Sequence, residues 1–160
     1  MRGPLIAVIG GSSATDEEAK LAEEVGRALG RAGAVLVCGG RTGVMEAACR
    51  GAREAGGLTV GILPGSDPGE ANPFVDIPVV TGIGYARNAI VTQTAQAVIA
   101  IAGSFGTLSE IGFALGYDKP LVGLRTWVVE REGHPSVPII RADTAEEAVE
   151  QALALAQTGP

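Results

Sequence analysis

Short, uninterrupted apolar runs alternate with longer amphipathic stretches along the chain, and this alternation constrains the fold most strongly. A strand covered by protein on both faces has no solvent-facing positions, so its sequence is apolar throughout, as in parallel sheets. The runs therefore predict buried parallel strands. These strands are expected at Leu5–Ile9, Ala34–Cys38, Leu58–Leu63, Ala97–Ile101 and Pro120–Leu124.

The segments between these runs carry the apolar spacing that is typical of helices. Helices are expected at Asp16–Ala32, Val44–Ala55, Tyr85–Thr94, Leu108–Tyr117 and Ala145–Ala156, short strands at Asp76–Val80 and Val137–Ile140, and a surface loop that could cover a ligand at Pro64–Pro73. Strand–helix alternation requires right-handed crossovers. We therefore predict an α/β fold with a doubly wound, Rossmann-like, mostly parallel sheet in a three-layer α/β/α sandwich, formed by residues 1–160 as a single domain.

Composition indicates where the protein is expected in the cell and which classes of partner are disfavoured. Apolar residues make up 46% of the chain, yet no apolar run approaches the ~20 residues that span a membrane. The first apolar stretch ends at Gly10, too early for a signal peptide, so a cytoplasmic protein without a membrane partner is expected. The net charge of −6 is spread over the helical segments, which disfavours nucleic acid as a partner.

Metal-binding residue types are sparse. Cys38 and Cys49 are too few and too widely spaced for a zinc cluster or a redox pair, and both lie in apolar segments. We expect buried free thiols at both positions. The single histidine, His134, cannot form a metal site alone, so no metal site is predicted.

Three predicted strands run directly into glycine-rich turns that open helices. Glycine lets the backbone approach an anion closely, and the helix that follows presents unpaired N–H groups to it. An arginine in one of these turns adds a charged fork suited to phosphate. The alternative is that glycine serves only the turn geometry and that the arginine is a solvated surface residue. The predicted phosphate-binding residues are Gly10, Gly11, Ser12, Gly39, Gly40, Arg41, Thr42, Gly43, Gly103, Ser104, Phe105, Gly106 and Thr107.

Two common nucleotide-binding motifs are absent from the sequence. No G-x-x-x-x-G-K-[ST] segment occurs, which disfavours a nucleoside triphosphatase. The segment Gly82–Arg87 carries arginine where G-x-G-x-x-G requires its third glycine. The second predicted strand ends in Cys38 rather than in the acidic residue that binds an adenosine ribose, so a dehydrogenase is also disfavoured.

Glu110 allows two interpretations. Thr107-Leu-Ser-Glu110 has the T-x-x-E pattern of a capping box, which also occurs at Thr15–Glu18 and Thr144–Glu147. However, Glu110 also follows a glycine-rich turn at the end of a central strand. Arg87 is expected to begin the preceding helix, so the two side chains could flank one ligand.

At these residues the chain resembles the LOG (Lonely Guy) family, from about Val8 to Leu124. Cys38–Glu46 resembles its GGGxxGxMG segment, Gly103–Glu110 its PGGxGTxxE signature, and Tyr85–Arg87 the arginine segment between them. LOG enzymes hydrolyse the N-glycosidic bond of cytokinin nucleoside 5′-monophosphates. The resemblance implies that Arg87 and Glu110 are the catalytic pair and that the glycine-rich turns hold the phosphate.

Several positions depart from the LOG pattern. Ala102 and Ser104 replace the proline and second glycine of the second signature, Cys38 and Glu46 replace the terminal glycines of the first, and Asn88 replaces a lysine. In these features the chain is similar to the branch that contains molybdenum cofactor carrier proteins. Two functions therefore stay open: a nucleoside 5′-monophosphate phosphoribohydrolase, or a non-catalytic carrier or sensor of a phosphorylated pterin, such as the molybdenum cofactor, or of a nucleotide. The resemblance also implies a homodimer or homotetramer and no required cofactor.

Overall fold

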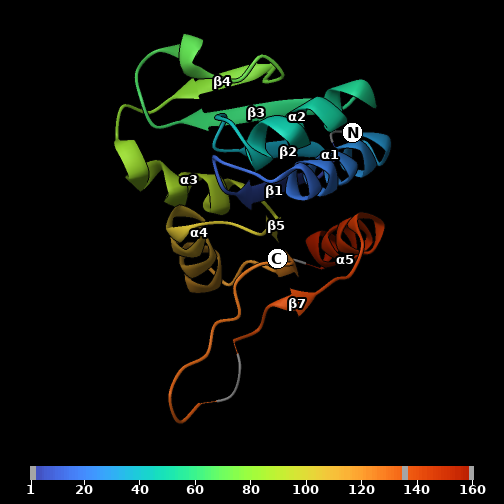
Figure 1. Ribbon diagram of the computed structural model, residues 1–160, viewed down its shortest axis with the longest axis vertical. Coiled ribbons are helices and arrows are strands. Elements are labelled where there is room, and N and C mark those ends of the chain that lie inside the picture. The colour runs from blue at the N-terminus through green and yellow to red at the C-terminus, as the bar shows by residue number, and fades with distance from the viewer. Residues whose placement is uncertain (1–2, 135–136, 159–160) are drawn as a thin grey trace.

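The computed structural model describes residues 3–134 and 137–158, and the strands of this part form one parallel sheet. The sheet has seven strands in the order β4-β3-β2-β1-β5-β6-β7, with every neighbouring pair parallel. From β1 the chain first adds β2, β3 and β4 on one side and then adds β5, β6 and β7 on the other. This arrangement confirms the predicted doubly wound α/β fold (Figure 1). The strands are β1 (Leu5–Gly10), β2 (Val35–Cys38), β3 (Leu58–Leu63), β4 (Ile77–Val80), β5 (Ala97–Ile101), β6 (Leu121–Leu124) and β7 (Ile140–Arg141).

Helices cover both faces of the sheet. Figure 1 shows α1, α2 and α5 on one face and α3 and α4 on the other. None of the described helices combines the length and the apolar character needed to cross a membrane. The helices are α1 (Asp16–Arg31), α2 (Val44–Glu54), α3 (Arg87–Thr94), α4 (Phe105–Gly116) and α5 (Ala145–Gln157), with 3-10 turns η1 (Pro68–Glu70) and η2 (Gly84–Ala86).

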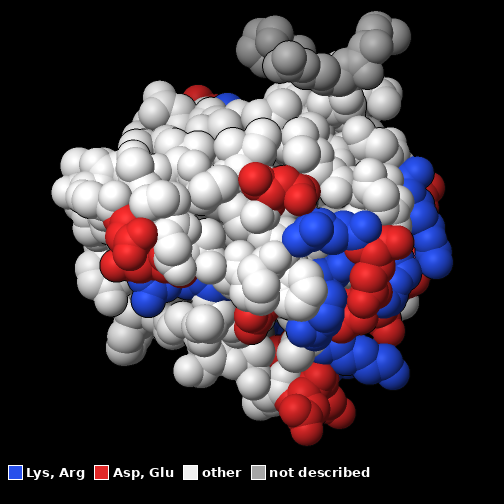
Figure 2. Space-filling view, turned by 90° about the horizontal axis from the view of Figure 1, so that it is seen from above, with Lys and Arg blue, Asp and Glu red and all other residues white. Residues whose placement is uncertain are grey.

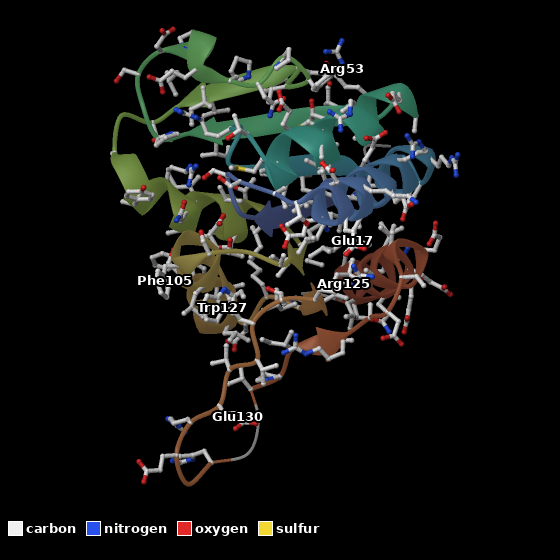
Figure 3. The ribbon with its side chains drawn as sticks, viewed as in Figure 1. Glu17, Arg53, Phe105, Arg125, Trp127 and Glu130 are labelled. Carbon is white, nitrogen blue, oxygen red and sulfur yellow. The ribbon has the colours of Figure 1, made fainter. Side chains whose placement is uncertain are left out.

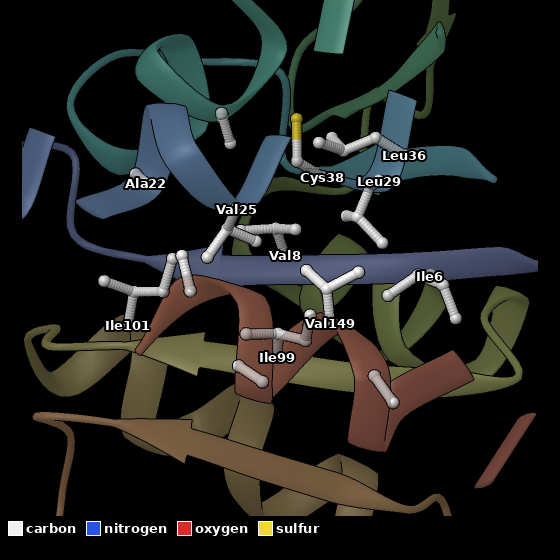
Figure 4. Packing of buried hydrophobic residues seen from close by; sticks show 14 of the residues in the cluster. Ile6, Val8, Ala22, Val25, Leu29, Leu36, Cys38, Ile99, Ile101 and Val149 are labelled. Carbon is white, nitrogen blue, oxygen red and sulfur yellow. The ribbon is translucent and has the colours of Figure 1, made fainter. Parts of the chain in front are cut away.

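The two faces explain why the strand sequences are apolar throughout. In β1, Ile6 and Val8 belong to the core beneath α1, α2 and α5, whereas Ala7 and Ile9 belong to the core beneath α3 and α4. Figure 4 shows Ile6 and Val8 beside Val149 of α5. Each fully buried Val or Ile side chain stabilises the fold by roughly 1.5–3 kcal/mol through removal of apolar surface from water.

Three elements begin two or three residues away from their predicted starts, whereas the other boundaries agree to within one residue. The strand predicted at Val137–Ile140 pairs only over Ile140–Arg141, because Pro138 has no N–H to donate to a ladder. The helix predicted from Leu108 begins at Phe105, directly after the glycine-rich turn. The helix predicted from Tyr85 begins at Arg87, because η2 precedes it.

α1 and α2 pack backbone against backbone through glycines. A Cβ atom on Gly26 would lie 1.9 Å from the Ala48 carbonyl oxygen, and one on Gly51 would lie 2.0 Å from the Glu23 carbonyl oxygen. Neither position can hold a larger residue without separating the helices. This contact holds α2 in place, and α2 begins directly after the second glycine-rich turn.

An ion-pair network covers the outer surface of α1 and α2. Glu23 bonds Arg27 and Arg50, each at 2.8 Å, and Arg27 also bonds Glu54 at 2.7 Å. The hydrogen bond from Arg50 is the main cause that lowers the pKa of Glu23. Figure 2 shows charged side chains gathered on the side where these helices lie. Because the charges neutralise one another, the hollow of about 350 Å³ on this surface offers no net positive charge to an anion.

Cys38 and Cys49 are buried free thiols, as predicted. Although they are far apart in sequence, their side chains are in contact. α2 turns back on the end of β2, so the two Sγ atoms lie 3.5 Å apart. The hydrogen bond between them lowers the pKa of Cys38, and the same bond together with burial raises that of Cys49. The Cys38 sulfur also accepts the Gly40 N–H at 3.3 Å, which ties the thiol pair to the second glycine-rich turn.

Candidate functional site

The candidate site lies beyond the carboxyl ends of β1 and β5, where the strand order reverses. In doubly wound sheets the connections leave such neighbouring strands toward opposite faces, and a crevice opens between them. Gly11 follows β1 and Gly103 follows β5, and a Cβ atom on Gly11 would lie 3.9 Å from the Gly103 Cα. The first and third predicted turns therefore meet at this point.

The second turn joins them from β2. The Val44 N–H donates to the Gly11 carbonyl at 3.0 Å, and the Thr42 hydroxyl donates to the Ser12 carbonyl at 2.8 Å. Gly43 has φ +66°, and a Cβ atom there would lie 2.4 Å from the Gly11 oxygen. Only glycine at position 43 allows the backbones of the two turns to come this close, so the turns after β1 and β2 form one continuous surface.

A cleft of about 450 Å³ opens beside these turns. Of the residues predicted from sequence, Ser12, Arg41, Thr42 and Arg87 line the cleft. Ser104, Phe105, Gly106 and Thr107 do not line it; they form the start of α4 on the far side of Gly103. The lining residues that sequence reasoning missed are Met45, Pro64, Gly84 and Tyr85.

Arg87 contributes a fixed charge to the cleft wall. It is only 7% exposed, and its Nε donates to the Ile62 carbonyl at 2.9 Å while Nη2 donates to the Gly39 carbonyl at 3.4 Å. A Cβ atom on Gly39 would lie 2.7 Å from Nη2, so the absence of a side chain there makes room for the guanidinium. Burial lowers the pKa of Arg87 below its ordinary value, and the charge of the nearby Glu110 opposes that shift.

Glu110 is a buried carboxyl group on α4. It is 7% exposed, and within the described residues its carboxyl oxygens have no hydrogen-bond partner. Burial raises its pKa to about 8, although the charge of Arg87 acts in the opposite direction. The carboxyl group is therefore protonated in most molecules at neutral pH, and it has free hydrogen-bonding capacity.

The capping interpretation of Glu110 is wrong. α4 begins at Phe105, so Thr107 lies inside the first turn, and its hydroxyl accepts the Ser104 N–H at 3.3 Å. The T-x-x-E pattern at Thr15 does form a capping box with Glu18, with bonds of 3.1 and 3.2 Å. At the start of α5, the Thr144 hydroxyl likewise accepts the Glu147 N–H.

Asn88 links the two helices that carry Arg87 and Glu110. Its amide oxygen accepts a hydrogen bond from Arg87, and its amide nitrogen donates to the Ser109 hydroxyl at 3.1 Å. Asn88 is 2% exposed, so these bonds are shielded from water. The residue that replaces a LOG lysine therefore holds the arginine in position instead of presenting a second charge.

The loop Pro64–Pro73 braces the second turn. The Asn72 side chain donates to the Arg41 carbonyl at 2.7 Å, and its N–H donates to the Gly40 carbonyl at 2.9 Å. Arg41 Nη1 lies 3.1 Å from Glu70 Oε2. Arg41 is thus neither free nor simply solvated, because an acidic side chain already occupies part of its guanidinium fork.

The fold, the three converging turns and the buried side chains of Arg87 and Glu110 are those of a Rossmann-like protein of the LOG-like superfamily. Residues 4–149 match the family described as the SLOG cluster4 family. The chain belongs to this family.

Comparison with similar proteins supports the same family assignment. The chain is 34% identical over 142 residues to a cytokinin riboside 5′-monophosphate phosphoribohydrolase of Mycobacterium tuberculosis, covering 77% of this chain and 76% of the relative. The molybdenum cofactor binding protein of Rippkaea orientalis is similar in structure, with a TM-score of 0.83 and 36% identity over 94% of this chain and 95% of that one. The molybdenum cofactor carrier protein of Chlamydomonas reinhardtii has a TM-score of 0.84 and 32% identity over 98% and 100%. The predicted resemblance to the LOG-like superfamily and its carrier branch is confirmed.

Proposed function

We propose that this protein binds a phosphorylated, nucleotide-like ligand at the carboxyl ends of β1, β2 and β5. The observation that carries the proposal is the meeting of the Gly10–Ser12 and Gly39–Gly43 turns with Gly103 beside a cleft lined by Arg41 and Arg87. Backbone N–H groups in such turns bind phosphate without a large positive surface. This mode of binding suits a chain with a net charge of −6.

Carriage without turnover is the function that we favour. The similarity to the molybdenum cofactor binding protein of Rippkaea orientalis spans nearly all of both chains and supports a phosphorylated pterin as cargo. The bonds of Arg87 to two backbone carbonyls and to Asn88 also support this function. A guanidinium held in this way provides a fixed charge that orients an anion.

Hydrolysis of a nucleoside 5′-monophosphate is the second candidate, and Glu110 is the observation that favours it. Its unpaired, protonated carboxyl group could donate a proton to the leaving base while water adds to the sugar carbon. The carboxylate left behind would stabilise the positive charge that develops on the sugar as the N-glycosidic bond breaks, and it would accept the proton that the water loses as it adds. In this reaction Glu110 and Arg87 form the catalytic pair.

One experiment separates the two functions. The protein is incubated with a panel of nucleoside 5′-monophosphates, and free base and ribose 5-phosphate are measured by chromatography. Base release that is lost in Glu110→Gln identifies the hydrolase. A raised melting temperature without base release identifies the carrier; a ligand at 100 times its Kd adds about 2.7 kcal/mol.

The matched variant is Arg87→Lys, which keeps the charge but loses the planar fork. We expect it to weaken both binding and any base release. If wild type and Arg87→Lys gave the same stabilisation by every nucleotide, the assignment of this cleft would be wrong.

The remaining proposals concern the molecule in solution. We infer a single cytoplasmic domain that needs no resident cofactor and forms a homodimer or homotetramer. The exposed face of α4 supports self-association, because Phe113 and Tyr117 stack there at 6.2 Å while 38% and 39% exposed. Light scattering of the purified protein measures the assembly directly.

A further inference from the structure

A second pocket opens beyond the ends of β5 and β6, on the other side of Gly103 from the cleft. Its volume is about 340 Å³. It is separate from the cleft, because the two share no lining residue. The lining residues are Glu18, Ala102, Gly103, Arg125, Thr126 and Trp127.

Trp127 is held rigidly at this pocket. Its indole N–H donates to the Ser104 carbonyl at 3.1 Å, and its own carbonyl accepts a bond from Arg141 at 2.6 Å. Phe105 stacks on the indole with ring centroids 5.8 Å apart and an interplanar angle of 28°, although Phe105 itself is 80% exposed (Figure 3). The aromatic pair is therefore a preorganised platform, fastened to the turn that opens α4.

The pocket walls adopt a backbone conformation that side chains disfavour. Ala102 has φ +45° and Arg125 has φ +49°. The Thr126 hydroxyl donates to the Ala102 carbonyl at 2.6 Å, and the Ala102 N–H donates to the Leu124 carbonyl at 3.1 Å. These bonds tie the ends of β5 and β6 together, so the strained turns hold the pocket open as one unit.

The polar groups of the pocket are only weakly engaged. Arg125 lies 3.6 Å from Glu17, and both side chains are mostly exposed, at 64% and 87% (Figure 3). One oxygen of Glu18 accepts the Thr15 N–H, and within the described residues the other has no partner. A guanidinium and a carboxylate oxygen therefore remain available beside the indole.

We propose that this pocket binds the planar nitrogen heterocycle of the ligand, a purine or pterin ring that carries an amino group. The ring stacks against Trp127, the guanidinium of Arg125 packs against the ring, and Glu18 accepts a hydrogen bond from the amino group. Gly103 lies between this pocket and the cleft, so the phosphate of the same molecule reaches the shared turn. The inference rests on the proposed binding of a phosphorylated ligand.

Trp127 is the single tryptophan of the chain, so its fluorescence reports directly on the pocket. The protein is titrated with AMP and with ribose 5-phosphate, which lacks the planar nitrogen heterocycle. We expect AMP to quench the fluorescence and ribose 5-phosphate to leave it unchanged. Calorimetry should show that Trp127→Leu raises the Kd of AMP roughly tenfold, because the stacking of one base on an aromatic side chain changes the affinity by about that factor. The Kd of ribose 5-phosphate should stay within twofold of the wild-type value.

A second variant guards against a folding defect in Trp127→Leu. Arg125→Gly removes the guanidinium and also relieves the left-handed backbone, so it should fold normally and still weaken AMP severalfold. Ile77→Val on the edge strand β4, an exposed position outside both pockets, is the control that should change the binding of neither ligand. If AMP binds wild type without quenching and with unchanged affinity in Trp127→Leu and Arg125→Gly, the ring site is wrong while the proposed function stands. If neither AMP nor ribose 5-phosphate binds, both are overturned.

Discussion

At the scale of single residues, Glu110 makes the stability of the fold depend on pH. Its pKa is about 8 in the folded protein against an ordinary value of 4.5, because burial disfavours the carboxylate. Between these values the folded state keeps a proton that the unfolded state releases, so stability falls as pH rises from about 4.5 to about 8. At 1.36 kcal/mol per unit, the expected loss is about 3–5 kcal/mol.

Glu110→Gln stays neutral and should escape this loss. Denaturant unfolding at pH 5 and pH 8.5 measures the free energy of unfolding of variant and wild type. The advantage of Glu110→Gln over wild type should be larger at pH 8.5 than at pH 5. Glu130→Gln, an exposed residue, is the control and should follow the wild type. If the free energies of unfolding of Glu110→Gln and wild type changed equally with pH, the burial of a protonated carboxyl group would be contradicted.

Glu70 competes with the ligand for Arg41. Its carboxylate lies 3.1 Å from the guanidinium, and both side chains are 42% exposed. Exposed pairs of this kind are worth about 0.2–1 kcal/mol, so Glu70→Gln should tighten AMP binding by up to about fivefold. Asp67→Asn removes the same charge from the same loop and should have a smaller effect. Equal tightening in both variants, measured by calorimetry, would indicate a general charge effect instead.

The roles that the sequence left undecided belong to residues whose partners are distant in sequence. The T-x-x-E pattern could not distinguish a cap from a buried Glu110, because the start of α4 depends on the turn before it. Asn88 carries no local signal, since its role comes from Ser109 on another helix. Arg87 was predictable as a candidate because it follows a glycine-rich segment that the LOG resemblance also singles out.

At the scale of elements, the strands were predictable and their ends were less so. Continuous apolar runs identified β1, β2, β3, β5 and β6, because burial on both faces leaves no other pattern. β7 was placed three residues early, since Val137 and Ile139 have strand-like side chains but Pro138 interrupts pairing. The contact of α1 with α2 could not be predicted, because it depends on which glycines face each other.

That helix contact supplies a stability prediction. Gly26→Ala would place a methyl group 1.9 Å from the Ala48 carbonyl oxygen, so the helices must move apart. We expect a loss of about 1–3 kcal/mol in urea unfolding, although alanine is the better helix former. Gly112→Ala on α4 is the matched control, because a Cβ atom there meets nothing within 4 Å, and it should be neutral or stabilising. Similar losses in both variants would show that close packing is not the cause.

At the scale of the whole molecule, the fold gathers residues far apart in the chain around one ligand. Gly11, Gly40 and Gly103 belong to turns that follow different strands, and the parallel sheet brings their ends to one edge. A ligand that bridges these turns must slow amide exchange in all of them together, because each turn supplies N–H groups to the same anion. Hydrogen–deuterium exchange with and without AMP measures this directly. We expect simultaneous protection after β1, β2 and β5 and none in α5, which lies on the opposite side of β1 and β5 from α3 and α4. Protection confined to one turn would mean that the ligand binds a single loop, and the convergence of the three turns would then serve only the geometry of the fold.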